Sequence, residues 1–397
     1  MNDEHSKLLP FGRAWRRADP AAAAAFKAMA RQLRVERESS AELVTRLLHE
    51  TPRAQWRSLA KRPELHIIGA LDQLSKEVDR RLDREPQEAL AIAELATDLL
   101  DELSADAYPR VTLAQLESHT WKDLGQALCY LSRYDDALAA LQKAETCVLP
   151  YGALQHDQAI VWFVRATVLQ HLRRFDEAQE LLTAASGVFQ GHHDHGLYAK
   201  CVLATGLLLI RRGNHSAAKK ILGPLVGQLD PSSNGLALLA LGWCCVYLGT
   251  PADAFPHFRK AAQTFDQLGQ RVQSVRAAWG IGAALLRQGR LETALDQLTT
   301  VRELFLTQQL TEEAGLAGLE IVEAQIQRAH HEEAKVLAAR VYGEFEEARM
   351  NHRAVAALGC LSEAVHASAA TPEVVRSVHE YIVALRNDPT REYNLPN

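Results

Sequence analysis

Apolar residues recur along most of the chain at the three- and four-residue spacing of an α-helix, with polar residues between them. One pattern repeats: a turn residue, a polar pair, an alanine, a large apolar residue four positions later, and a small or apolar residue three positions after that. The alanines that open its copies lie 36 to 41 residues apart, at Ala137, Ala178, Ala218, Ala254, Ala294 and Ala334. An earlier, divergent copy contains Ala89, Ala93 and Ala96. A fixed period of this length predicts stacked pairs of helices.

The small residues of the pattern indicate how the two helices of a pair meet. Alanines seven positions apart let the second helix approach its neighbour closely, and the large residue between them, such as Leu141 or Phe258, fills the remaining space. The preceding helix carries a matching small residue, at Gly125, Ala166, Gly206, Gly242 and Gly282. A glycine inside a helix costs roughly 1 kcal/mol of helix propensity, so its recurrence predicts a close crossing at that point.

The first helices of the pairs are therefore expected at 113–131, 158–172, 197–212, 235–248, 273–288 and 313–328. Each should pack antiparallel to the helix that follows it. Hydrophobic residues make up 47% of the chain and are mostly alanine and leucine, which favours helix over strand. No run of β-branched residues alternates with polar ones, so an all-α chain is predicted.

Two stretches carry the signature of a known repeat, namely Trp121-x2-Leu124-Gly125 in a first helix and Gly249-x4-Ala254-x3-Phe258-x2-Ala261 at a second one. This order resembles the tetratricopeptide repeat (TPR) in a long-period form of about 40 residues, where about 34 is usual. The resemblance covers roughly residues 110–345, and the proline that ends the family's repeat is found after one copy, at Pro150. It implies a right-handed α-solenoid of stacked antiparallel helix pairs, a TPR-like superhelix. Long-period relatives include bacterial peptide-sensing regulators and the arms of large signalling ATPases.

The flanks depart from the repeat. Residues 1–62 are predicted to form a basic helical cap or head, with a separate helix that Ser40 would cap at its start. Residues 63–110 form a divergent first pair, 111–345 the repeats, 346–386 capping helices and 387–397 a tail. Thr371 and Pro372 should open the last helix, which runs to Leu385.

Charge separates the two ends of the chain. The net charge is −5, so the chain as a whole has no nucleic-acid footprint, but residues 1–62 hold 13 Lys+Arg against 7 Asp+Glu. Phosphate contacts from this head would come from Arg13, Arg16, Arg17, Arg31, Arg34 and Arg37. No apolar run reaches the 18 or so residues of a membrane span, and residues 1–10 lack a signal core. We therefore expect a cytoplasmic protein without membrane contact.

Candidate chemistry is sparse. His192, His193 and His195 with Asp194 could ligate zinc or nickel, but adjacent loop histidines rarely converge on one ion, so a solvated loop is predicted. Cys244-Cys245 lies in an apolar helix and is predicted to be small core residues. Nucleotide-binding, hydrolase and metalloprotease motifs are absent from the sequence. We expect no cofactor, no metal and no catalysis.

The resemblance also implies where a partner binds, because the first helices of tetratricopeptide arrays line the concave surface. Carried over copy by copy, the groove residues are His119, Lys122, Gln126, Tyr130, Phe163, Thr167, Gln170, His171, Leu203, Leu207, Trp243, Tyr247, Arg276, Trp279, Arg287 and Glu323. Aromatic residues there would anchor a partner, although Trp243 and Trp279 could instead pack between repeats. Lys122 is followed by Gln126, and no asparagine pattern recurs, so an apolar helix or extended peptide is a better expected ligand than a carboxylate tail.

Three functions follow as hypotheses. The first is a protein–protein interaction scaffold or adaptor that binds a protein or peptide in the groove. The second is a peptide- or effector-sensing regulator linked to signalling or transcription. The third is an accessory subunit that contacts nucleic acid through residues 1–62.

Overall fold

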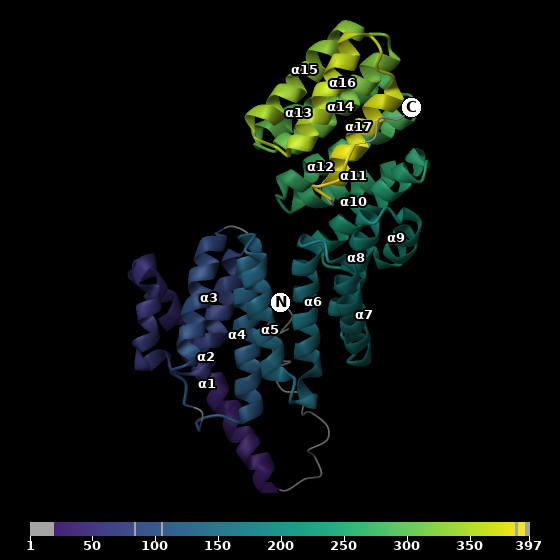
Figure 1. The fold of residues 1–397 in the computed structure, drawn as a ribbon. Helices are drawn as coiled ribbons and strands as arrows, with labels where there is room; N and C mark the ends of the chain where they lie inside the picture. Colours follow the sequence, from purple (N-terminus) through teal and green to yellow (C-terminus); the bar gives the residue numbers. More distant parts are fainter. Residues whose placement is uncertain (1–19, 83–84, 105, 386–387, 394–397) are drawn as a thin grey trace. The chain divides into compact units, whose positions relative to one another are not determined.

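The computed structural model describes residues 20–82, 85–104, 106–385 and 388–393. Within these ranges the regular structure is helical and contains no strand. The chain divides into two compact units, Met1–Tyr198 and Ala199–Asn397, with the boundary inside one helix (Figure 1). The prediction of an all-α chain is confirmed.

The first unit contains seven α-helices among its described residues. They are α1 (Pro20–Glu50), α2 (Ile68–Arg81), α3 (Pro86–Leu100), α4 (Arg110–Tyr130), α5 (Tyr134–Val148), α6 (Gln155–His171) and α7 (Phe175–Gly191). Short 3-10 segments lie at Arg53–Lys61, Pro63–Leu65 and Gly152–Leu154. From α2 onward each helix packs against the next.

The second unit continues the same pattern from α8 (His195–Arg211), whose first residues belong to the first unit. It contains α9 (His215–Leu222), α10 (Pro231–Tyr247), α11 (Pro251–Gln267), α12 (Arg271–Arg287), α13 (Leu291–Thr307), α14 (Thr311–Gln327), α15 (His331–Glu347), α16 (His352–His366) and α17 (Pro372–Leu385). A 3-10 segment, Gly223–Leu225, follows α9. The predicted first helices correspond to α4, α6, α8, α10, α12 and α14, with small shifts at their ends.

The predicted crossings are confirmed by the space around the glycines. A Cβ on Gly242 would lie 2.5 Å from the ring of Phe258, and one on Gly125 or Gly282 would lie 2.7 Å from the leucine of its second helix. The Cβ of Gly206 would also collide with Leu222. These distances are far below van der Waals contact, so α4, α8, α10 and α12 need glycine where the large residue of the second helix inserts.

The last repeat inverts the sizes of the two crossing residues. In the five pairs from α4–α5 to α12–α13 the small residue precedes the large one by 16 positions, as Gly242 precedes Phe258. The same interval in α14 and α15 joins Val322 to Ala338, and both are buried in one core cluster. At these two positions the larger residue thus lies on the first helix instead of the second.

A second crossing, which the repeat pattern did not predict, uses phenylalanine near the end of the second helix. Phe189, Phe265, Phe305 and Phe345 are each 0–1% exposed. A Cβ on Gly235 would lie 2.7 Å from the ring of Phe265, and Gly315 faces Phe345 in the same way. The pairs α10–α11 and α14–α15 therefore have a second close contact near the end of the second helix, which helps to set the angle between their helices.

The N-terminal prediction of two helices is wrong. The chain forms one continuous helix, α1, through Ser40. The Oγ of Ser40 donates a 2.6 Å hydrogen bond to the carbonyl oxygen of Glu36, one turn back, instead of capping a new helix. At the other end α17 begins at Pro372 as predicted, and the amide of Val374 donates to Oγ1 of Thr371.

Candidate functional site

The first helices of the pairs lie side by side within each unit. In the first unit α2 contacts α4, and α4 contacts α6; in the second unit α10 contacts α12, and α12 contacts α14. We call the surfaces formed by these two sets the first-helix faces. They carry the side chains predicted to meet a partner.

Lys122 lies on the first-helix face of the first unit and is already paired. Its Nζ lies 2.5 Å from Oδ1 of Asp123 and 3.3 Å from Oε1 of Gln126. Burial lowers the pKa of Lys122, but the carboxylates of Asp123 and Asp79 outweigh burial, so the pKa is raised above its usual value. The ammonium therefore stays charged, and its charge is balanced by the chain's own carboxylates.

The other predicted residues of this face differ in exposure. Tyr130, at the end of α4, is 51% exposed, and Thr167 in α6 is exposed as well. Phe163 is half-buried and Gln170 is buried, so the prediction that Gln170 faces an open groove is wrong. It points into the packing of α6 because its position falls on the helix's buried side. Tyr130 and Thr167 remain accessible to a partner.

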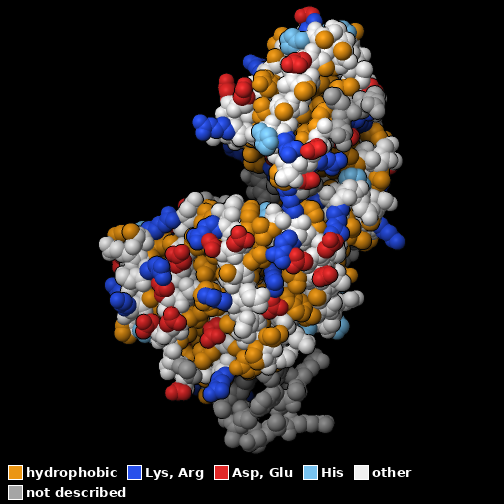
Figure 2. All heavy atoms as spheres, in the orientation of Figure 1, with side chains coloured by type: hydrophobic (Ala, Val, Ile, Leu, Met, Phe, Trp, Pro, Cys, Tyr) orange, Lys and Arg blue, Asp and Glu red, His pale blue; other side chains and the backbone are white. Residues whose placement is uncertain are grey.

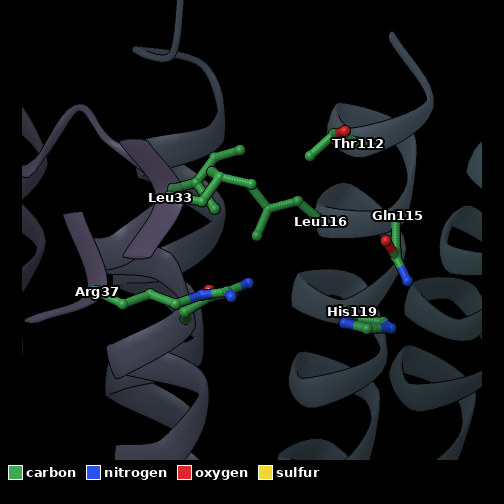
Figure 3. A pocket seen from close by; sticks show the side chains of 8 residues that line it. Leu33, Arg37, Thr112, Gln115, Leu116 and His119 are labelled. Atoms are coloured by element: carbon green, nitrogen blue, oxygen red, sulfur yellow. The ribbon is translucent and has the colours of Figure 1, made fainter. Parts of the chain in front are cut away.

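A small hollow lies between α1, α2 and α4 (Figure 3). It is lined by Leu33, Arg37, Ile68, Asp72, Thr112, Gln115, Leu116 and His119. Oδ1 of Asp157 lies 2.8 Å from Nε2 of His119 and accepts a 2.9 Å hydrogen bond from Gln115. Burial raises the pKa of Asp157, but His119 and Gln115 outweigh it and the pKa is lowered. Nε of Arg37 lies 2.5 Å from Oδ2 of Asp72, so the charges around the hollow are balanced from within the chain.

The aromatic residues predicted in the second unit form a packed row. The ring centroid of Trp243 lies 5.3 Å from that of Trp279 and 5.5 Å from that of Phe258. Trp279 is only 7% exposed, so these indoles hold α10, α11 and α12 together. Tyr247 is 45% exposed and stacks on His215 with 4.5 Å between ring centroids. Tyr247 is thus the aromatic residue of this row that a partner can reach.

Three side chains of α12 each meet a carboxylate of α14. The pairs are Arg276 with Glu313, Trp279 with Glu320 and Arg287 with Glu323, each with 2.6 Å between nitrogen and oxygen. Arg276, Arg287 and Glu323 were predicted to face a partner. In the structure Arg276 pairs with Glu313 and Arg287 pairs with Glu323, so these side chains join α12 to α14. Such pairs are charge-assisted or partly buried and orient both helices.

Glu320 is the most perturbed of these carboxylates. It is 3% exposed, and burial raises its pKa from 4.5 to about 8, although the Trp279 indole and Arg287 oppose the change. The Trp279 Nε1–H donates to Oε2 of Glu320 at 2.6 Å. A carboxyl group with this pKa carries a proton for much of its population near pH 7.

Helix α17 reaches the same carboxylates, a contact that was not predicted from the sequence. An Nη of Arg376 lies 2.6 Å from Oε1 of Glu323, and Nε2 of His379 lies 3.9 Å from Oε1 of Glu320. The available signal was two glutamates in an otherwise apolar stretch of α14, since buried carboxylates need partners. Which segment supplies those partners could not be read from their spacing.

The alternative chemistries have structural explanations. Asp194, in the histidine-rich loop, accepts a 3.1 Å hydrogen bond from the amide of Leu197 at the start of α8. Across the described residues, no three His, Cys, Asp or Glu side chains gather in a metal-binding arrangement. Cys244 and Cys245 are fully buried, and burial raises the pKa of Cys244 to about 11. The prediction that these cysteines are core residues is confirmed.

The basic residues of the N-terminal segment are only partly described. Arg31 and Arg34 are exposed on α1, Arg34 pairs with Glu38 at 2.9 Å, and Arg37 pairs with Asp72. Arg13, Arg16 and Arg17 lie outside the described residues. Figure 2 shows basic and acidic side chains interspersed on the visible face of the first unit. None of the helices in the described part of the chain is both long and apolar enough to cross a bilayer.

Comparison with known proteins finds the fold in solved structures. No family model matches the chain, and no curated protein matches it significantly. A signal transduction ATPase with numerous domains (STAND) from Pyrococcus horikoshii, which has a tetratricopeptide repeat sensor, matches with a TM-score of 0.59 and 15% identity over 89% of this chain and 53% of that chain. The apo form of the quorum sensor NprR from B. thuringiensis matches with a TM-score of 0.55 and 10% identity over 86% and 99%.

At these identities the likeness is one of fold. Together with the paired helices and their crossings, it establishes a tetratricopeptide-type α-solenoid of stacked antiparallel pairs. The family resemblance inferred from the repeat is confirmed at the level of the fold. This chain spans about half the length of the matched STAND protein.

Proposed function

We propose that the chain is a non-catalytic adaptor that binds protein or peptide partners on its first-helix faces. The observation that carries the proposal is the exposure of Tyr130 and Tyr247 at equivalent positions, each at the end of a first helix. Tyr247 stacks on His215 and is still 45% exposed, and Tyr130 is 51% exposed, so part of each ring faces solvent. Exposed tyrosines lose little conformational entropy on binding and commonly anchor protein partners.

The surroundings of these tyrosines suit a binding surface better than a catalytic one. The charged residues nearby on the first helices are tied up in pairs such as Lys122 with Asp123 and Arg287 with Glu323. A general base or nucleophile needs access to substrate as well as a tuned pKa. Glu320, the carboxyl group with the highest pKa, is buried between helices. We place the protein in the cytoplasm, because its six cysteines are all free.

The test is capture of partners from native cells by crosslinking, followed by mass spectrometry. Tyr130→Ala and Tyr247→Ala should each reduce recovery of a partner at least fivefold, because each removes an anchor from the first-helix face of its own unit. Val336→Ala is the matched control, since Val336 is the most exposed large apolar residue of the described chain, at 72%, and lies on a second helix. Equal recovery by all three variants, with circular dichroism unchanged, would disprove binding on these faces.

A second candidate function is sensing of a peptide or small effector. Its support is that both matched proteins are named for sensors, one a quorum sensor and the other a signalling ATPase with a repeat sensor. A sensor must change shape when it binds. Small-angle scattering should therefore show a change in radius of gyration on addition of the recognised peptide, and a constant radius across a peptide library would reject this function.

The third candidate, nucleic-acid contact by residues 1–62, has Arg31 and Arg34 exposed in its favour. Binding through phosphates weakens steeply with salt. A gel shift that is absent even at low salt would eliminate it.

A further inference from the structure

The last helix departs from the packing rule of the repeat. In the pairs α10–α11, α12–α13 and α14–α15, the second helix packs on the first helix of its own pair. By its place in the chain α17 should pack on α16, but it packs more extensively on α14 (Figure 1, yellow). The helix has therefore left the second-helix position and lies against a first helix of the preceding pair.

The side of α14 that α17 covers is part of the first-helix face. Arg287 of α12 and Arg376 of α17 both reach Oε1 of Glu323, each at 2.6 Å. Glu320 is likewise met from α12 by Trp279 and from α17 by His379. Because Glu323 occupies a predicted groove position, α17 lies where the repeat architecture places a ligand.

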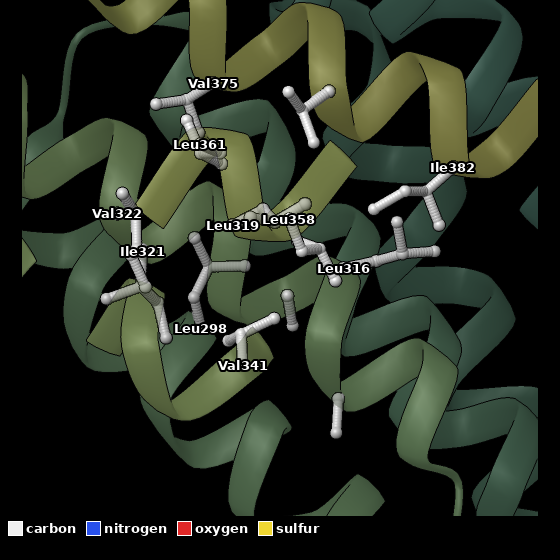
Figure 4. Packing of buried hydrophobic residues seen from close by; sticks show 14 of the residues in the cluster. Leu298, Leu316, Leu319, Ile321, Val322, Val341, Leu358, Leu361, Val375 and Ile382 are labelled. Atoms are coloured by element: carbon white, nitrogen blue, oxygen red, sulfur yellow. The ribbon is translucent and has the colours of Figure 1, made fainter. Parts of the chain in front are cut away.

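The chemistry of α17 is that of an amphipathic helix with a basic edge. Val375, Val378 and Ile382 form an apolar stripe, and all three are buried. Figure 4 shows Val375 and Ile382 among the leucines of α14 and α16. Beside the stripe, Arg376 and His379 lie three positions apart, which brings both onto one side of the helix, where they face Glu323 and Glu320.

We propose that the surface formed by α12 and α14 is a receptor for an amphipathic helix with two basic residues three positions apart, and that α17 is its built-in occupant. The inference rests on the proposed function, because it identifies the ligand class of that face. A partner helix of the same chemistry competes with α17 for the carboxylate of Glu323 and for the place of His379 beside Glu320. The contact of α17 is thus autoinhibitory.

The negative charge of Glu323 disfavours acidic helices as ligands of this surface. Glu323 is 2% exposed and takes one cation from each side. Removal of α17 leaves that carboxylate with Arg287 and uncovers apolar residues of α14 such as Leu316. A helix that replaces α17 must supply both a cation for Glu323 and an apolar stripe, because a buried charge without its partner is costly. An acidic helix would place like charges together at this point.

The experiment measures binding of a labelled peptide, residues 371–385, to the full chain by fluorescence anisotropy. In the wild-type chain α17 competes and binding should be weak. Arg376→Glu in the chain places a carboxylate against Glu323 and loosens α17, so the wild-type peptide should bind at least tenfold tighter. Glu333→Lys is the matched control, since it reverses an exposed charge on α15 instead of on α17, and it should leave peptide affinity within twofold of wild type.

Two further arms identify the receptor. Adding Glu323→Gln to the Arg376→Glu chain should weaken binding of the wild-type peptide at least tenfold. A peptide that itself carries Arg376→Glu should bind the Arg376→Glu chain at least tenfold more weakly than the wild-type peptide does. If the Arg376→Glu chain does not fold by circular dichroism, Arg376→Gln replaces it with the same expected order of affinities.

The inference is overturned if the loosened chain does not bind the peptide, or binds it equally well with Glu323 replaced. These results leave the proposed function intact if partner recovery still depends on Tyr130 or Tyr247. Conversely, peptide binding can require Glu323 while partner recovery does not depend on Tyr130 or Tyr247. That result supports the receptor for an amphipathic helix and rejects the proposed function.

Discussion

The ring of Phe258 fills the space that a side chain on Gly242 would need, since a Cβ there would lie 2.5 Å from Cε1 of the ring. Gly280, on the first helix of the next pair, faces the same ring as closely. One phenylalanine therefore fixes both the crossing inside its own pair and the approach of the following pair. The relationship makes glycine obligatory at two positions whose backbone is ordinary helix.

The crossing predicts the effect of enlarging Gly242. Gly242→Leu should lower the free energy of unfolding by roughly 1–3 kcal/mol, because the added volume has to displace Phe258. Gly187→Leu is the matched control, as Gly187 lies within α7, is exposed and has no atom within 4 Å of its missing Cβ. That variant should be neutral or gain about 0.5–1 kcal/mol from helix propensity. Urea denaturation compares the two, and equal effects would refute a tight crossing.

The inverted pair, Val322 and Ala338, predicts a compensation. Ala338→Leu alone should destabilise the second unit by roughly 1–3 kcal/mol through overpacking. Adding Val322→Gly should recover part of that loss, since it recreates the glycine–leucine pair of the earlier repeats. A double-mutant cycle should give a coupling of about 0.5 kcal/mol or more. Strictly additive effects would show that the two side chains do not share one space.

Glu320 predicts a pH dependence of stability. Its pKa in the folded chain is raised to about 8 by burial, so between about pH 4.5 and pH 8 the folded state binds a proton that the unfolded state releases. Stability from this group is therefore present below pH 4.5 and is lost as the pH rises through 8. Glu320→Gln should flatten this fall. Denaturation from pH 5 to 8 measures the slope, and Glu332→Gln, which alters an exposed carboxylate, should retain the wild-type slope.

Thiol reactivity should follow burial. Cys360 is exposed, whereas Cys201 and Cys244 are buried and burial raises their pKa to about 12 and about 11. Because the thiolate is the reactive form, iodoacetamide should label Cys360 first in the native protein. Peptide mass spectrometry over time gives the order. Early labelling of Cys244 would mean that α10 opens locally.

The repeat itself could be predicted from the sequence. Ala137, Ala254 and Ala294 are each fully buried, as their spacing predicted, because a helix that meets a neighbour at a fixed period must carry small residues at the contact. The crossing glycines could be found for the same reason. The phenylalanine of the second crossing, such as Phe305, follows the same 40-residue period. Its burial could therefore have been predicted from the spacing as well.

The binding residues were harder to predict, because a position on a first helix does not determine exposure. Tyr247 and Trp279 were both assigned to the groove from their places in the repeat, yet Tyr247 is open and Trp279 is packed against Glu320. Trp279 is closed because α14, 41 residues further along the chain, supplies the carboxyl group of Glu320 to its indole. Tyr247 stacks on His215 and remains 45% exposed.

The helices, their pairing and the residues at their crossings follow from the sequence, since they depend on contacts between neighbouring elements that repeat along the chain. Which face remains exposed depends on contacts between distant segments. Ser40 bonds back along α1 instead of starting a helix, and α17 lies on α14 instead of completing its own pair. Both outcomes depend on burial by distant segments. The buried carboxylate of Glu323 needs a cationic partner, and the local sequence does not show that Arg376 supplies it.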